Sequence, residues 1–191
     1  MPSASKRQPA EPAVRYEHVT FSVDSYHVRV EADINRDATN PEYAYRDTQE
    51  QPLYQFLTHL DINGTCLAPG KRAGASCELT IYSDDNPNSA IYWKLRDVQL
   101  LDEGHAPVYR QYRGKRIPVY APPKGIGSFG KQFGEHHWRG AVFVPPRFVT
   151  DLLLALGTAR PLFLSLLEAR QRRRSWLARI GLQTANPMDE E

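Results

Sequence analysis

Hydrophobic and polar residues alternate near the start of the chain in a way that predicts β-strands. Apolar side chains occupy every second position across residues 19–23, and the alternation resumes across residues 26–34. This period of two is typical of an antiparallel sheet that has one face in solvent. Residues 14–34 are therefore predicted to form two strands, joined by a tight turn at Asp24-Ser25.

The same pattern predicts further strands at residues 53–62, 77–81, 91–101 and 138–144. Turn-forming residues separate them, including a polar loop at 35–52, Asn63-Gly64 and the proline- and glycine-containing loop 67–76. Cys77, Leu79 and Ile81 are expected to point inward. The apolar positions of the strand 91–101 change phase near its middle, which predicts a β-bulge there.

One helix is expected after the strand that ends at Pro145-Pro146. Apolar residues follow at helical spacing across residues 148–156, and Gly157 is the expected end of the helix. Residues 162–182 fit two patterns. Wound as a helix, they place Arg170 and Arg174 within the apolar stripe, so a hairpin is favoured. The inward residues of that hairpin would be Leu162, Leu164, Leu166, Trp176, Ala178, Ile180 and Leu182.

About nine short strands and one short helix at residues 146–156 predict a mainly β fold, either an antiparallel β-sandwich or an open barrel. The alternative is an α+β fold with an additional C-terminal helix. The chain length of 191 residues suits one compact domain. We expect a flexible leader at residues 1–13, a single β-rich domain at 14–185 and an acidic tail at 186–191.

Charge is distributed unevenly along the chain, although the net charge is only +2. Residues 1–107 have a balance of −6, residues 108–180 a balance of +11, and the remaining tail a balance of −3. Such a division predicts a basic surface for an anionic partner, or two complementary faces on one molecule.

The two cysteines, Cys66 and Cys77, are expected to be reduced thiols in a cytoplasmic protein, because no secretory signal precedes them. A bridge between them is the alternative if the arms around residues 65–77 pair as a hairpin. No apolar run approaches the roughly 20 residues that cross a bilayer, so no membrane contact is expected.

Motifs for catalysis and cofactor binding are incomplete. The stretch 125–132 is close to a phosphate-binding loop, but Gln132 replaces the hydroxyl residue that binds magnesium, and no helix is expected to follow. Glu135-His136-His137 has no third ligand at metal-binding spacing. We therefore predict no catalytic residue, no cofactor and no metal site, and an enzyme is the least supported class.

Cations and aromatic residues alternate between residues 109 and 139, and a second basic group follows near residue 172. Candidate residues for binding a partner or an anion are Arg110, Arg113, Lys115, Arg116, Lys124, Lys131, Arg139, Arg172, Arg173 and Arg174. Candidate stacking residues are Tyr112, Tyr120, Phe129 and Phe133. The alternative explanation is that the aromatic residues belong to the core and the cations are simply solvated.

Two functions from different classes are consistent with these patterns. The first is a non-catalytic cytoplasmic binding or adaptor domain that contacts another protein through its loops, within an assembly. The alternative is a nucleic-acid-binding β-domain that uses the basic, aromatic-rich residues 108–180, because cations neutralise phosphates and aromatic rings stack on bases. Another protein is therefore the expected partner, and nucleic acid the alternative one.

Overall fold

The computed structural model of the chain describes residues 13–34, 54–85, 89–121, 125–132, 136–171, 174–186 and 189. The strands in these residues are β1 (Arg15–Ile34), β2 (Tyr54–Ala68), β3 (Ser76–Ser83), β4 (Tyr109–Tyr112), β5 (Lys115–Pro118), β6 (Gly127–Lys131), β7 (His137–Val144), β8 (Phe163–Gln171) and β9 (Arg174–Gln183). The α-helix is α2 (Pro146–Thr158), and the short 3-10 helices are η2 (Gly70–Arg72), η3 (Ala90–Tyr92) and η4 (Leu95–Val98).

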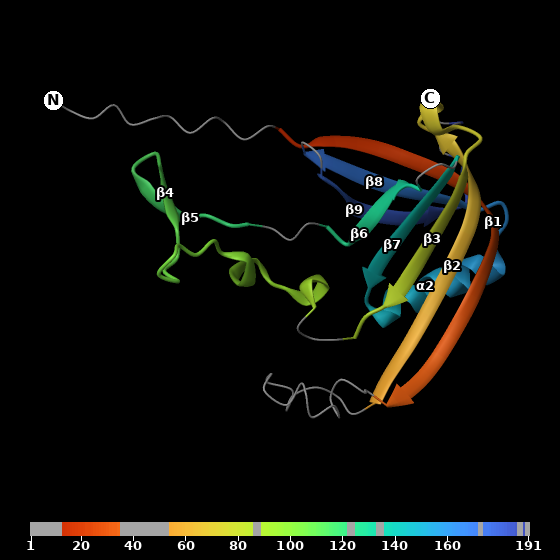
Figure 1. Cartoon of the computed structure of the whole chain (residues 1–191), viewed down its shortest axis with the longest axis horizontal. Coiled ribbons are helices and arrows are strands. Elements are labelled where there is room, and N and C mark those ends of the chain that lie inside the picture. Colours follow the sequence, from red (N-terminus) through yellow and green to blue (C-terminus); the bar gives the residue numbers. More distant parts are fainter. Residues whose placement is uncertain are drawn as a thin grey trace.

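Seven strands close into a barrel in the order β1-β2-β3-β7-β6-β9-β8, and β8 pairs with β1 (Figure 1). Strands β4 and β5 form a separate two-stranded sheet. The prediction of a mainly β fold with one short helix is confirmed. One described pair of the barrel, β3 with β7, is parallel. Parallel neighbours need a long connection, and here the chain from β3 to β7 includes β4, β5 and β6.

The predicted turns at Asp24-Ser25 and Asn63-Gly64 are wrong, because β1 and β2 run straight through these positions. The register between them shifts at Asp24, whose carboxylate accepts hydrogen bonds from Ser22 Oγ at 2.8 Å and Thr65 Oγ1 at 2.9 Å. A Cβ on Gly64 would lie 1.8 Å from the Ser22 carbonyl oxygen. These turn-forming residues therefore allow a β-bulge and a close approach of two long strands.

The hairpin prediction for the C-terminal segment is confirmed, since β8 and β9 pair from Phe163 to Gln183. The inward set on β9 differs from the prediction because the register shifts between Leu167 and Glu168. Leu177 is fully buried as a result, whereas Ala178 is exposed. A bulge reverses which side chains face the core, and strict alternation along the sequence does not reveal it.

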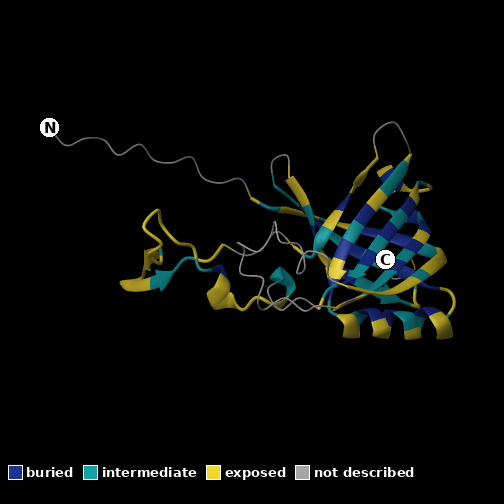
Figure 2. Ribbon diagram, turned by 60° about the horizontal axis from the view of Figure 1, so that its bottom comes forward, coloured by how far each residue is buried: buried dark blue, intermediate teal, exposed yellow. Residues whose placement is uncertain are grey.

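Helix α2 begins and runs where the apolar spacing predicts, although it continues through Gly157 to Thr158. Its buried residues Val149, Leu152 and Leu156 belong to the barrel core, and the helix lies across the bottom of the barrel in Figure 2. The other side of the helix, including Leu154, faces solvent. The helix therefore closes one end of the barrel.

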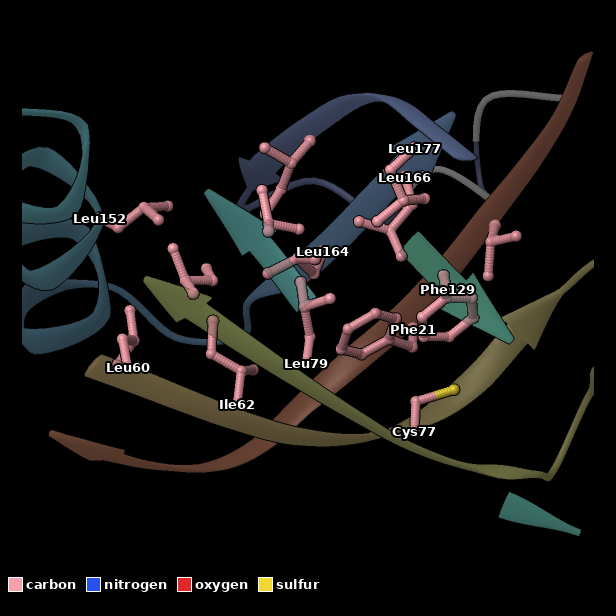
Figure 3. Close-up of a cluster of buried hydrophobic side chains, with 14 of the residues drawn as sticks. Phe21, Leu60, Ile62, Cys77, Leu79, Phe129, Leu152, Leu164, Leu166 and Leu177 are labelled. Atoms are coloured by element: carbon pink, nitrogen blue, oxygen red, sulfur yellow. The ribbon is translucent and has the colours of Figure 1, made fainter. Parts of the chain in front are cut away.

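The core fills the interior of the barrel with side chains from every barrel strand. Figure 3 shows Phe21 of β1 beside Phe129 of β6, with Leu79, Leu164 and Leu166 around them. Cys77, Leu79 and Ile81 are buried, as predicted for β3. These side chains form one continuous apolar interior, which holds the barrel strands together.

The two cysteines are free, buried thiols at the edge of this core. Burial, together with the neighbouring Cys66, raises the pKa of Cys77 to about 12, and burial raises the pKa of Cys66 as well. Only the thiolate is an effective nucleophile, and the raised pKa values keep both thiols mainly protonated at pH 8.

We therefore expect both thiols to be nearly inert toward Ellman's reagent in the native protein at pH 8. In guanidinium chloride both cysteines should react with the reagent in a single phase, because unfolding removes the burial that suppresses ionisation of the thiols. Rapid labelling without denaturant would contradict the buried positions of Cys66 and Cys77.

Candidate functional site

The structure divides the predicted contact cations between two places. Arg110, Arg113, Lys115 and Arg116 are exposed on the hairpin of β4 and β5. Lys131, Arg139 and Arg174 are exposed residues of the barrel strands β6, β7 and β9. The remaining predicted residues, Lys124, Phe133, Arg172 and Arg173, lie outside the described residues.

The hairpin belongs to a longer projection, residues 89–121, which we call the arm. The predicted long strand at 91–101 is wrong: this part of the arm forms η3, η4 and isolated bridges that pair Gln99 with Tyr120 and Leu101 with Pro107. Backbone hydrogen bonds within the arm, such as Leu100 N–H to Val119 O at 2.8 Å, hold it together. Figure 2 shows the arm projecting from the barrel, mostly exposed.

The large apolar side chains of the arm point into solvent. Val98 is the buried hydrophobic residue among those described in the arm. The exposed ones are Tyr92, Trp93, Leu95, Leu100, Leu101, Tyr109, Tyr112 and Tyr120. Many large exposed apolar side chains on one segment are typical of interaction sites, whereas single exposed residues need no such explanation.

Tyrosine and arginine side chains of the arm associate with each other. The guanidinium carbon of Arg116 lies 4.1 Å from the ring centroid of Tyr109, and that of Arg113 lies 5.3 Å from the ring of Tyr112. These are cation–π distances. The predicted stacking residues Tyr112 and Tyr120 are exposed, so their rings are accessible at the surface of the arm.

Phe129, another predicted stacking residue, is a core residue instead. Its side chain is 2% exposed and points inward from β6 (Figure 3). The ring stacks with Trp138 at a centroid distance of 5.8 Å. Alternation along β6 decides this placement, because Ser128 and Gly130 take the outward positions. Sequence composition alone does not distinguish the inward set from the outward one.

A groove of about 620 Å³ crosses the outer face of β3, β7 and β6. Its lining includes Lys131, Arg139, Glu78 and Tyr82, and a Cβ added at Gly130, also in the lining, would meet no atom within 4 Å. Arg139 Nη2 donates to Glu78 Oε2 at 2.8 Å, and His137 Nε2 lies 3.3 Å from the same oxygen. Two of the predicted cations thus meet in one groove.

A charged cluster that was not predicted from the sequence joins η2 to the barrel strands β1 and β8. Arg72 Nη2 donates to Glu168 Oε2 at 2.7 Å and to Glu17 Oε2 at 2.8 Å. Arg170 Nε binds Glu168 Oε1 at 2.9 Å, and Lys71 binds Glu17. The side chains of Arg72 and Glu168 are 1% and 2% exposed. The sequence signal for this cluster was Glu168, an acidic residue within the apolar run of β8.

The guanidinium of Arg72 also packs on an aromatic ring. Its Cζ lies 3.9 Å from the ring centroid of Trp138. The Nε and Nη1 atoms of Arg72 are buried without a hydrogen-bond partner among the described residues, so the ring face supplies their favourable contact. Partial burial raises the pKa of Glu17, but the hydrogen bond from Lys71 and the charges of Arg72, Lys71 and Arg170 outweigh it and hold the pKa below the usual value for a glutamate. Glu17 is therefore ionised at neutral pH.

The described residues contain no group of three or more His, Cys, Asp or Glu side chains arranged to hold a metal ion. His137 is instead positioned by Ser76 Oγ, 2.8 Å from its Nδ1, and by Glu78. Within the same described ranges, no helix combines the length and apolar character needed to cross a membrane.

Comparison of the chain with protein-family models, curated proteins and solved structures gives no match. Function is therefore inferred from the arm, the groove and the charged cluster.

Proposed function

We propose that this protein is a non-catalytic binding module that contacts another protein through the arm. The observation that supports this proposal most directly is the exposure of large apolar side chains on a segment that is ordered by its own hydrogen bonds. The barrel core is filled without side chains from the arm, so the barrel does not use these residues for its packing. An assembly partner that covers them would remove apolar surface from water.

Composition of the arm also fits a protein interface. Tyrosine, tryptophan and arginine are the residues that contribute most often to binding energy at such interfaces. The arm presents Trp93, Tyr109, Tyr112 and Arg116 together with exposed leucines. Free, buried thiols support a reducing compartment such as the cytoplasm.

A photo-crosslinking amino acid tests this proposal in the native cell. Leu95 of the arm and Leu154 of α2 are matched positions, because their side chains are 65% and 63% exposed. We expect the crosslinker at Leu95 to give one discrete adduct that protease destroys and nuclease does not. The same group at Leu154 should give none. Equal labelling from both positions, or none from either, would contradict a protein partner on the arm.

Nucleic acid is the second candidate partner, supported by the four exposed cations of the hairpin and the accessible rings of Tyr112 and Tyr120. Phosphate contacts would make binding fall steeply with salt. In the crosslinking experiment this alternative predicts an adduct at Leu95 that nuclease shortens. The same measurement therefore separates the two classes of partner.

A further inference from the structure

The barrel closes through a short seam between β6 and β9. The register pairs only Gly127 with Leu177 across the seam, whereas β8 pairs with β1 from Arg15 to Ser22. Beyond Gly127, the described part of β6 pairs with β7 alone. Because backbone groups alternate between the two edges of a strand, the second edge of β6 offers N–H and C=O groups to an added strand.

A notch of about 300 Å³ lies where the two strands diverge. Its lining consists of Phe129, Gly130 and Lys131 of β6, Trp138 of β7, Glu168 and Arg170 of β8, and Arg174 and Ser175 of β9. The notch shares Phe129, Gly130, Lys131 and Ser175 with the outer groove of about 620 Å³, so the two form one continuous depression. Both volumes are within the range of about 300–1,000 Å³ that is usual for ligand sites.

The charges around this depression favour an acidic occupant. Arg139 binds Glu78, while Arg72 and Arg170 bind Glu168, so the local carboxylates already have cationic partners. Lys131 and Arg174 are exposed and have no acidic partner in the described part of the chain. Two cations on opposite sides of the notch can therefore pair with carboxylates that enter from outside.

We propose that the seam between β6 and β9 binds an extended, acidic segment of a partner protein, which adds to the edge of β6 as a further strand. Main-chain hydrogen bonds to β6 hold the segment, and Lys131 and Arg174 select its carboxylates. A nucleic-acid strand is a poorer fit. Phe129 is buried and Trp138 packs against Phe129 and Arg72, so the notch lacks an open ring for base stacking. This surface is separate from the arm and adds a second contact to the proposed function.

Gly130→Phe tests whether the depression is occupied. A Cβ at Gly130 meets no atom within 4 Å, so the new side chain enters the groove without disturbing the backbone. Gly181→Phe is the matched control, because Gly181 lies in the far part of β9 and a Cβ there also meets no atom within 4 Å. Circular dichroism and thermal melting of both variants establish that the fold is retained.

The probe is a fluorescein-labelled peptide of about eight residues in which glutamate alternates with valine, measured by fluorescence anisotropy. We expect saturable binding to the wild-type chain, and an affinity about tenfold lower for Gly130→Phe but unchanged for Gly181→Phe. A peptide with N-methyl groups on alternate amides should bind at least tenfold more weakly, since it lacks the donors for strand addition.

Charge reversal provides an independent variant if Gly130→Phe does not fold. Lys131→Glu combined with Arg174→Glu should abolish detectable peptide binding, whereas Arg179→Glu, an exposed arginine of β9 outside the depression, should change affinity little. Absence of peptide binding by wild type, or equal effects of both charge variants, would overturn the proposal. It would also be overturned if a labelled oligouridine bound more tightly than the peptide and was affected by the same variants.

The outcomes for this seam and for the arm are separate. If the crosslinker on the arm gives no adduct but the peptide still binds, only the proposed arm contact is refuted.

Discussion

Phe129→Ala should lower the free energy of unfolding by about 3–5 kcal/mol, as measured by guanidinium or thermal unfolding. The ring is 2% exposed and packs against Trp138 inside the barrel, so its removal loses apolar burial and leaves a cavity. A surface stacking residue would behave differently: its replacement would weaken binding and leave stability almost unchanged.

Phe143→Ala is the control for that measurement. Phe143 lies on neighbouring β7, is 45% exposed and stacks on Tyr82 at a centroid distance of 5.2 Å. Its loss should reduce the free energy of unfolding by about 1 kcal/mol. Similar effects of the two replacements would contradict the inward position of Phe129.

Arg72→Met should reduce the free energy of unfolding by about 3 kcal/mol. This value is at the lower end of the range for removing one partner from a buried ion pair, because Arg170 still binds Glu168 after the change. Methionine keeps most of the packing volume but leaves Glu168, 2% exposed, with half of its charge partners. Chemical unfolding at neutral pH measures the effect.

Lys71→Met is the matched control, since Lys71 directly precedes Arg72 and also pairs with Glu17. Its side chain is 59% exposed, so the pair is screened by water and its loss should change stability by less than about 1 kcal/mol. A change at Lys71 as large as the change at Arg72 would mean that burial of Arg72 contributes nothing.

Regular alternation predicted the class of fold and the C-terminal hairpin. The deciding residues were Arg170 and Arg174, which would lie on the apolar side of a helix but reach solvent from a hairpin. The predicted turns were wrong because contacts between residues distant in sequence decide the structure there. Asp24 and Gly64 have the composition of turns, yet pairing of β1 with β2 across the bulge stabilises both as strand residues. The turn propensity of a single segment does not reveal which strand it will pair with.

The candidate site was less predictable than the fold. A run of cations indicated a basic surface, but its division between the arm and the barrel depends on the excursion of residues 89–121 away from the barrel. Lys131 and Arg174 are distant in sequence and come together because β6 and β9 are neighbours in the barrel. Arg72 and Glu168 meet through β1, which pairs with both β2 and β8.

The pairing of the first strand with the C-terminal hairpin has a consequence for synthesis on the ribosome. Arg15 pairs with Arg170, so β1 cannot gain its second neighbour until β8 has left the exit tunnel. Contacts that join distant parts of a chain slow folding, and an unpaired strand edge invites association with other chains in the meantime. A nascent chain that ends before β8 would expose the edge of β1, and this edge stays open to association with other chains until the hairpin of β8 and β9 emerges.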